Sequence, residues 1–369
     1  NVHSSVPGKV VEIKEMFTVF GNRNVVVVES GGSFSRPARL DAPPNIEDFS
    51  KDEIIEAIRS AGIVGLGGAS FPTAVKLSPP PDARVDTLVV NGSECEPYLT
   101  VDDMLMNTFP EEIITGVRIT LRALGINRAI VGIEKNKPAA IAALRNAVKS
   151  LNLPENITVK ALPARYPQGA EKQLIYSLTK RKVPSGALPF KIGVVVQNVG
   201  TLFAIREAVL FKKSLYERYL TVSGSLVNNP GNYKVRSGTL ISDIAADCGG
   251  LKGNPAKILI GGPMCGIALP DMNVPVVKGT SGILFLSEDE VHTAKDYRHC
   301  IRCGKCVSVC PIGLLPYELG TSVEKTRFDI SDGLNPLDCI MCGSCAFECP
   351  SLRPLPHFIK IAQDHIRNK

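Results

Sequence analysis

Short apolar runs alternate with stretches of helical periodicity between residues 50 and 215. An unbroken β-branched run is typical of a buried strand, and an amphipathic stretch of ten or more residues is typical of a helix. Strands that alternate with helices predict an α/β domain whose sheet is covered by helices. The expected strands are 85–90, 128–135, 157–164 and 192–197, and the expected helices are 110–125, 137–150 and 200–219.

The segments that flank this alternation have a different pattern. Residues 219–275 predict a strand, an Asn-Pro-Gly turn, a second strand and an amphipathic helix that ends in glycines. Near the N-terminus, the four valines at 25–28 predict a buried strand. No apolar run approaches the ~18 residues of a membrane span, so we expect no transmembrane segment in this sequence.

The composition is typical of a globular protein, with 44% hydrophobic and 21% charged residues in a chain of 369. This length allows about two to four domains. The net charge of +6 is spread along the chain without a basic run, which argues against a nucleic-acid partner. Eight of the eleven cysteines lie in the last seventy residues, and no secretory signal is visible. Clustered cysteines in such a chain indicate metal rather than disulfides.

Two cysteine runs near the C-terminus repeat one pattern. Residues 300–311 and 339–350 both fit C-x2-C-x2-C-x3-C-P, the run that binds 4Fe–4S clusters in bacterial proteins. Structural zinc is the alternative, but zinc sites usually pair two C-x2-C units across a longer spacer. In two-cluster proteins three thiolates of a run hold one cluster, and the fourth, expected at the start of a helix, reaches the other. The expected sets are Cys300, Cys303, Cys306 and Cys349 for one cluster, and Cys339, Cys342, Cys345 and Cys310 for the other.

The three remaining cysteines share no spacing with these runs. Cys95, Cys248 and Cys265 are therefore interpreted as small buried side chains, although Cys95 lies inside a polar motif.

Four loops of unusual composition adjoin the predicted strands. The glycine-rich loop at 62–72 lacks the third glycine of a dinucleotide fingerprint and the Gly-Lys pair of a phosphate-binding P-loop. The other three loops are 91–103, 165–173 and 198–201. Ligands of α/β sheets bind beyond the carboxyl ends of strands, so we expect these loops to converge on one cleft. Taken singly, an acidic residue after a strand is more often a helix cap than a ligand.

The residues of two of these loops resemble a known pair of motifs. Gly-Leu-Gly-Gly-Ala-Ser-Phe-Pro-Thr-Ala at 65–74 and Asn-Gly-Ser-Glu-Cys-Glu-Pro at 91–97 resemble the flavin-binding motifs of the NADH-oxidising subunit of respiratory complex I. With the two cysteine runs behind them, nearly the whole chain more closely resembles the RnfC family of the Rnf complexes. These membrane-bound complexes couple electron flow between ferredoxin and NAD to ion translocation. The sequence departs from the complex I pattern at Leu66, Ser70, Ala74, Ser93 and Ala170.

The resemblance implies two 4Fe–4S clusters, a non-covalent FMN and NAD(H) as substrate. It implies that Lys76 neutralises the phosphate side of the flavin and that Asn91 and Glu94 hold its polar ring edge and ribityl hydroxyls. The resemblance also implies that Asn198 and Thr201 bind the phosphate, and free amides with the helix dipole favour an anion at such a helix N-terminus. The remaining implied flavin contacts are Gly65, Gly67, Gly68, Ser93, Tyr166 and Gly169.

The same resemblance implies where the nicotinamide nucleotide binds. Phe71 would stack on it, and Glu96 and Glu171 would line its pocket. Glu94 and Glu96 are the implied catalytic residues.

Four domains follow from the resemblance. The expected order is a partial barrel-sandwich hybrid at 1–42, an FMN- and NADH-binding α/β domain at 43–217, a soluble-ligand-binding β-grasp domain at 218–290 and a helical two-cluster ferredoxin-type domain at 291–369. We interpret the first as scaffold and the β-grasp domain as a packing and docking module.

The favoured function is a peripheral oxidoreductase component of an Rnf complex on the cytoplasmic face of the bacterial cell membrane. It would exchange electrons between NAD(H), through FMN and two clusters, and other Rnf subunits or ferredoxin, coupled to Na+ or H+ translocation. Two alternatives remain open: a stand-alone flavin and iron–sulfur cobalamin reductase, and an iron–sulfur electron wire without flavin.

Overall fold

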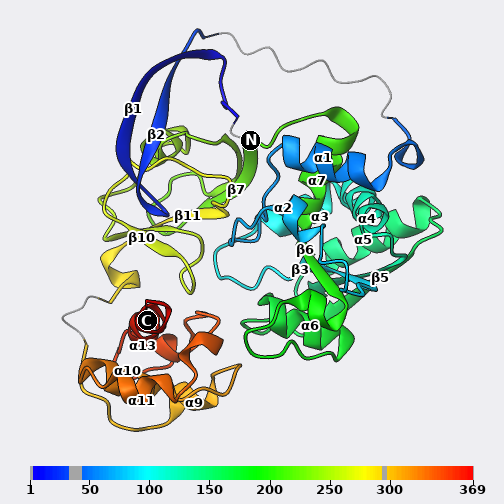
Figure 1. Ribbon diagram of the computed structural model, residues 1–369. Coiled ribbons are helices and arrows are strands. Elements are labelled where there is room, and N and C mark those ends of the chain that lie inside the picture. The colour runs from blue at the N-terminus through cyan, green and yellow to red at the C-terminus, as the bar shows by residue number, and fades with distance from the viewer. Residues whose placement is uncertain (1–2, 33–43, 293–296, 369) are drawn as a thin grey trace.

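The computed structural model describes residues 3–32, 44–292 and 297–368. Figure 1 shows three regions: a large α/β domain on the right, a β-rich region on the left and a small helical domain below it, which contains the C-terminus. Within the described residues, no helix is both long enough and apolar enough to cross a bilayer.

The α/β domain is built on four parallel strands in the order β5-β4-β3-β6. From β3 the chain steps outward through β4 to β5, and it then returns to place β6 on the other side of β3. The space between β3 and β6 is therefore a topological switch point, where α/β sheets commonly bind ligands. The strands are β3 (Thr87–Gly92), β4 (Arg128–Glu134), β5 (Asn156–Leu162) and β6 (Val194–Asn198), which confirms the four predicted strands to within two residues at every end.

Helices cover both faces of this sheet. Alternate strand residues point to opposite sides, so Leu88 packs against the larger group of helices whereas Val89 faces α6 (Glu171–Thr179). The longest of these helices, α4, has proline in its first turn, and Gly125 ends it in a left-handed conformation at φ 68°. The larger group is α1 (Lys51–Ser60), α2 (Thr73–Lys76), α3 (Val101–Thr108), α4 (Pro110–Leu124), α5 (Pro138–Ser150) and α7 (Val199–Phe211).

One predicted helix is too long. The expected helix at 200–219 ends at Phe211, where Lys212 adopts a left-handed conformation at φ 53°. The chain then enters β7 (Glu217–Ser223), in which the Glu217 carboxylate pairs with Lys213 and Lys234. The apolar spacing of 200–219 suits a helix throughout, so local spacing does not predict the left-handed Lys212 that ends the helix or the pairing of β7 with β8.

The β-rich region contains a five-stranded sheet in the order β10-β9-β11-β7-β8, with β11 parallel to β7. The predicted strand, Asn-Pro-Gly turn, strand and helix are present, and α8 ends before the left-handed Gly249 and Gly250. This mixed sheet with one packed helix is the expected β-grasp fold. Its further elements are β8 (Gly231–Arg236), α8 (Ile241–Asp247), β9 (Lys257–Ile260), β10 (Ile267–Leu269) and β11 (Gly282–Leu286).

An antiparallel hairpin, β1 (Gly8–Thr18) and β2 (Gly21–Ser30), extends from the β-grasp sheet. The predicted strand at 25–28 forms, but the expectation that it is buried is wrong, because Val26 is 54% exposed. A two-stranded hairpin leaves both faces uncovered, so an apolar run alone does not establish burial. The turn of the hairpin is better packed: Thr18 is buried and its hydroxyl donates to the Gly21 carbonyl.

The C-terminal domain is a set of short helices around the two cysteine runs. The fourth cysteine of each run was expected at the start of a helix, but Cys310 and Cys349 instead follow the one-turn helices α9 and α12. The elements are α9 (Lys305–Ser308), α10 (Pro316–Glu324), α11 (Phe328–Asp332), α12 (Ser344–Phe347) and α13 (Leu355–Arg367).

Candidate functional site

A cavity of about 430 Å³ lies where the α/β domain, the β-grasp region, the hairpin turn and the C-terminal domain meet. The α/β domain contributes the glycine loop and the carboxyl ends of β3 and β6. The lining from elsewhere consists of Val19, Phe20, Ile260, Gly261, Gly262, Cys265, Gly266, Ile267, Val277, Gly279, Thr280, Ser281, Ile340 and Cys342.

Two asparagines mark the switch point at the bottom of this cavity. Asn91 on β3 and Asn198 on β6 are direct neighbours in the sheet, and both line the cavity. The Asn91 amide donates to the Gly169 carbonyl at 2.8 Å, which ties the loop after β5 to β3. The Asn198 Oδ1 accepts from the Gly200 amide at 2.8 Å and so caps α7.

The glycine loop passes close to Asn198. A Cβ on Gly67 would lie 3.3 Å from the Asn198 Cβ, so a larger residue there would crowd the asparagine. Gly68 has φ 111°, and Ser70, where the complex I pattern has glycine, also has a positive φ of 52°. The Ser70 hydroxyl lines the cavity and is buried without a hydrogen-bond partner among the described residues.

Glu94 and Asp102 form a pair of carboxyl groups in the cavity wall. The Glu94 carboxylate caps α3, accepting from the amides of Asp102 at 2.8 Å and Asp103 at 3.2 Å. Burial, and then the neighbouring Asp102, raise the pKa of Glu94 well above its usual range. Burial also raises the pKa of Asp102, although Asn198 donates to its carboxylate at 2.6 Å and Arg218 is nearby. The pair therefore holds protons more tightly than exposed carboxylates do.

Glu96 connects the α/β domain to the β-grasp region. Its Oε2 accepts from the Met264 amide at 3.2 Å, and a Cβ on Gly262 would collide with the same carboxylate. Its Oε1 is buried, and no described residue donates a hydrogen bond to it. Glu96 thus presents an unsatisfied acceptor at the cavity.

Of the fourteen predicted flavin and nucleotide residues, nine line the cavity and five lie outside its lining. The ammonium group of Lys76 binds the Glu171 carboxylate at 3.0 Å and the Val196 carbonyl at 2.9 Å. Thr201 is fully buried and accepts from the Leu66 amide at 2.9 Å, which fixes the glycine loop to α7. The nine are Gly67, Gly68, Asn91, Ser93, Glu94, Glu96, Tyr166, Gly169 and Asn198, and the five are Gly65, Phe71, Lys76, Glu171 and Thr201.

Sequence reasoning missed the contribution of the β-grasp region to the cavity. The Gly-Gly-Pro-Met-Cys-Gly turn at 261–266 is the signal that was available, since it packs three glycines into six positions. The prediction for the three isolated cysteines is confirmed only for Cys248, which is buried. Cys265 is exposed, whereas Cys95 is half-buried, and both line the cavity.

Four cysteines surround a second space in the C-terminal domain, which we call the inner ring: Cys310, Cys339, Cys342 and Cys345. The inner ring adjoins the cavity, because Cys342 lines both. The Tyr166 hydroxyl donates to the Cys342 carbonyl at 2.6 Å and lies 3.0 Å from the Cys265 sulfur. The α/β domain therefore holds the inner ring directly.

The other four cysteines surround a third space, which we call the outer ring: Cys300, Cys303, Cys306 and Cys349. Each ring thus takes three cysteines from one run and the fourth from the other. Cys306 and Cys345 share one apolar cluster, so the two rings are adjacent. Among the described residues no three ligand-type side chains are close enough for a single metal ion. Four thiols around a wider space suit a cluster better than one ion.

A cavity at a sheet switch point beside two rings of four cysteines defines an iron–sulfur protein with a separate organic-ligand site. Three family models match the chain in the same order. The Nuo51 FMN-binding domain matches residues 58–207, the SLBB domain matches 219–268 and the 4Fe–4S dicluster domain matches 299–352. The chain therefore carries an FMN-binding domain and a dicluster domain, which agrees with the predicted fold class.

Curated relatives identify the family. The chain is 43% identical over 366 residues to the C subunit of the Na+-translocating ferredoxin:NAD+ oxidoreductase complex of Acetobacterium woodii, covering 99% of this chain and 82% of the relative. It is 42% identical over 369 residues to the C subunit of the proton-translocating complex of Clostridium ljungdahlii, covering 100% of this chain and 80% of the relative. The chain belongs to the RnfC family of ion-translocating ferredoxin:NAD+ oxidoreductase complexes, as the sequence predicted.

A solved structure shows the same fold. An NAD+-reducing NiFe hydrogenase in the H2-reduced state aligns with a TM-score of 0.61 at 20% identity, over 89% of this chain and 64% of the hydrogenase chain.

The cavity and the rings fit the cofactors that the family models name. The cavity offers two buried polar atoms without partners in the described chain, Ser70 Oγ and Glu96 Oε1, which a bound polar ligand would satisfy. Backbone at Gly67 and Gly68 lets a flat ring approach closely. Each cysteine ring supplies the four thiolates that a 4Fe–4S cluster requires.

Proposed function

We propose that this chain exchanges electrons between NAD(H) at the cavity and an iron–sulfur partner at the outer ring. One observation supports this function above the others: Cys342 lines both the cavity and the inner ring. The cavity therefore adjoins the inner ring, and Cys306 and Cys345 bring the inner ring beside the outer ring in one apolar cluster. FMN exchanges a hydride with NAD(H) and single electrons with 4Fe–4S clusters, which is why one chain carries both kinds of cofactor.

The chain's own residues would hold these groups as follows. Gly67 and Gly68 would lie against the flavin, and Asn91 and Asn198, which line the cavity from the ends of β3 and β6, would face it. Ser93, Gly169 and Tyr166 complete its surroundings, and Glu96 offers its free oxygen to the flavin or the nucleotide.

The carboxyl group of Glu94 serves as a proton store beside the flavin. Its raised pKa keeps a proton available in the buried wall of the cavity. Hydride transfer delivers two electrons with one proton, so a flavin that is reduced and then reoxidised one electron at a time needs a neighbouring group that takes and gives protons.

The five predicted residues outside the lining would affect the cavity indirectly, by fixing or flanking the loops that line it. Thr201 fixes Leu66 in the glycine loop, and Lys76 with Glu171 ties α2 to α6 and the end of β6. Phe71 is 49% exposed, which leaves its ring free to contact a nucleotide that approaches the cavity, and Gly65 packs beside its backbone.

The complex named in the relatives implies the remaining partners. We propose that the chain binds the membrane subunits of an Rnf complex from the cytoplasmic side, coupled to transport of Na+ or H+. We also propose that the four domains divide after residues 42, 217 and 290.

Anaerobically prepared protein tests the proposal. It should release one FMN per chain into acid, contain about eight iron atoms, and oxidise NADH with a small artificial acceptor. Gly67→Ala, which crowds Asn198, should lower the FMN content at least about threefold, whereas Gly253→Ala, whose added Cβ would have its nearest neighbour at 3.9 Å, should leave it unchanged. Iron without FMN in the wild type would refute the flavin site.

A further inference from the structure

The two cysteine runs form an internal repeat whose copies have matching backbones but opposite surroundings. Cys-Ile-Arg-Cys-Gly-Lys-Cys at 300–306 corresponds to Cys-Ile-Met-Cys-Gly-Ser-Cys at 339–345. Arg302 and Met341 both have φ 54°, and each donates its amide to the sulfur two residues earlier at 3.4 Å. One loop can therefore be compared directly with the other.

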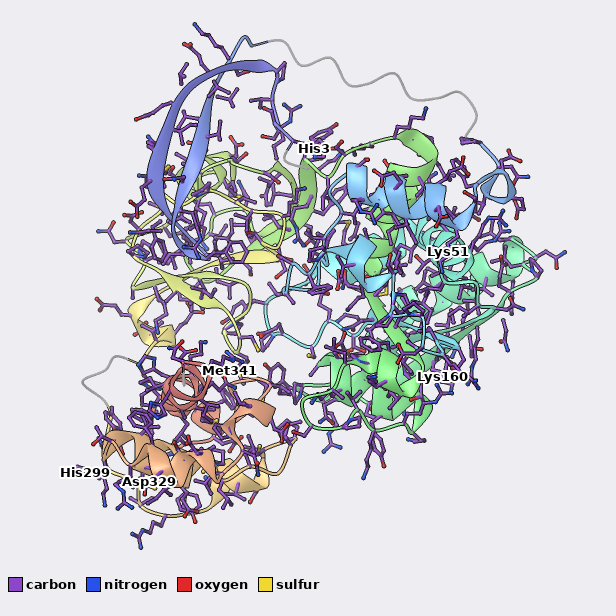
Figure 2. The ribbon with its side chains drawn as sticks, viewed as in Figure 1. His3, Lys51, Lys160, His299, Asp329 and Met341 are labelled. Atoms are coloured by element: carbon purple, nitrogen blue, oxygen red, sulfur yellow. The ribbon has the colours of Figure 1, made fainter. Side chains whose placement is uncertain are left out.

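The inner copy, residues 339–345, is docked against the rest of the protein. The carbonyl of Met341 lies 3.5 Å from the Cys265 sulfur, and that of Cys342 accepts from Tyr166. A Cβ on Gly343 would collide with the Met264 carbonyl oxygen, which shows how closely this loop packs. Ile340 reaches the cavity itself. In Figure 2, Met341 lies on the side of the C-terminal domain that faces the other domains.

The outer copy, residues 300–306, has the same shape and no cover from the described chain. Ile301, the counterpart of Ile340, is 67% exposed. A Cβ on Gly304 would meet nothing within 4 Å. Cys303 is exposed whereas its counterpart Cys342 is buried. Figure 2 shows His299, directly before this loop, at the outer edge of the domain.

The outer loop also differs from the inner loop in charge, because two uncharged residues of the inner loop are replaced by cations. Arg302 replaces Met341, and Lys305 replaces Ser344. Arg298 adds a third exposed cation, and the stretch 298–305 contains no acidic residue. None of the three forms a salt bridge with a carboxylate of the described chain. An exposed apolar residue within a short stretch that carries such cations offers a surface that attracts and orients an acidic partner.

We propose that the outer loop is the docking surface for a small acidic iron–sulfur protein, with Ile301 as the apolar contact and Arg298, Arg302 and Lys305 as the orienting charges. The inner loop shows how a loop of this shape packs against a neighbouring cofactor site. The outer loop has the same shape at the edge of the outer ring, where a separate protein could pack against it in the same way. This inference deepens the proposed function, on which it rests for the direction in which electrons leave the chain.

Direct binding tests the surface independently of catalysis. Anaerobic interferometry would measure the Kd of the full chain for an acidic two-cluster bacterial ferredoxin at low and at high salt. Arg302→Glu combined with Lys305→Glu should raise Kd at least about tenfold at low salt, and the difference should shrink in high salt. Ile301→Ala should weaken binding at both salt concentrations.

A matched control reverses the same amount of charge elsewhere. Lys51 and Lys160 are exposed on the α/β domain, away from the outer loop (Figure 2), so Lys51→Glu with Lys160→Glu should change Kd less than about twofold. Iron content should be equal in all variants. Equal weakening by both double variants, or no binding of the ferredoxin by the wild type, would overturn the docking surface. A wild type that binds ferredoxin but does not oxidise NADH would instead count against the proposed function alone.

Discussion

The Tyr166 hydroxyl donates a hydrogen bond of 2.6 Å to the carbonyl of Cys342, so one side chain of the α/β domain fixes the inner ring against the cavity. Burial and the adjacent Cys265 thiol raise the pKa of Tyr166, which keeps the phenol protonated and able to donate. The junction between the two domains thus depends on a donor that does not titrate near neutral pH.

Tyr166→Phe should loosen this junction. The Cys342 carbonyl would lose its partner, at a cost of about 1–3 kcal/mol if it stays buried. We expect unchanged iron content and a slower appearance of reduced clusters after NADH is added, with flavin reduction little affected. Stopped-flow absorbance separates the two phases, and cluster reduction as fast as in the wild type would show that the bond does not position the ring.

Gly262→Ala should disturb the cavity from the β-grasp side. A Cβ there would collide with the Glu96 carboxylate, whereas a Cβ on Gly253 would have its nearest neighbour at 3.9 Å. We expect Gly262→Ala to raise the KM for NADH or to lower FMN content several-fold, and Gly253→Ala to behave as the wild type does. Indistinguishable variants would mean that this loop is only a packing element, as the sequence had suggested.

Glu94→Gln should change how stability depends on pH. The folded-state pKa of about 8 lies above the ordinary value of 4.5, so the folded protein binds this proton more tightly than the unfolded chain does. The resulting stability is present at low pH and is lost as the pH rises through about 8. Glutamine has no such proton to lose, so the variant should gain thermal stability relative to the wild type as the pH is raised from about 5.5 to about 8.5.

Glu53→Gln is the matched control for this experiment. Glu53 also caps a helix, α1, but its pKa is lowered by hydrogen bonds from Ser50, so its contribution has the opposite sign. Its replacement should be more costly above pH 4.5 than below. Parallel unfolding curves for the wild type and Glu94→Gln across the range would contradict the assignment of a raised pKa to Glu94.

Cys349→Ser and Cys310→Ser should remove different clusters. Cys349 belongs to the outer ring and Cys310 to the inner ring, although each lies in the other run. We expect each variant to lose about half of its iron. Only Cys310→Ser should then uncouple the cavity from the remaining cluster, which electron paramagnetic resonance after NADH addition would show. Identical behaviour of the two variants would argue against the order of the rings.

Local sequence patterns predicted most strands and helices, because apolar periodicity, β-branched runs and capping residues act within a few positions of the chain. The β-branched runs became β3, β4 and β6, and Gly125 ends α4 as expected. The rule that ligands bind at the carboxyl ends of strands led to Asn91 and Asn198, which the sheet makes neighbours. The cysteine spacing likewise indicated the two groups that the structure forms.

The remaining features depend on contacts between distant parts of the chain. Part of the cavity wall comes from outside the α/β domain, at Gly262, Cys265 and Phe20. The hydrophobic pattern of a sequence does not show which domains will contact one another. The resemblance implied that Lys76 lies at the flavin phosphate, yet the Glu171 carboxylate and the Val196 carbonyl bind its ammonium group. Val26 is exposed for the same kind of reason. The valine run at 25–28 predicts a strand, but whether that strand is buried depends on a second layer that packs against it.

An anaerobic titration with NADH, which follows flavin and iron–sulfur absorbance together, tests the central claim most directly. The contact of Cys342 with both the cavity and the inner ring predicts that NADH bleaches the flavin and then the clusters within one chain, without any added carrier. If dithionite reduces the clusters but NADH bleaches the flavin alone, the cavity and the cysteine rings do not form one electron path.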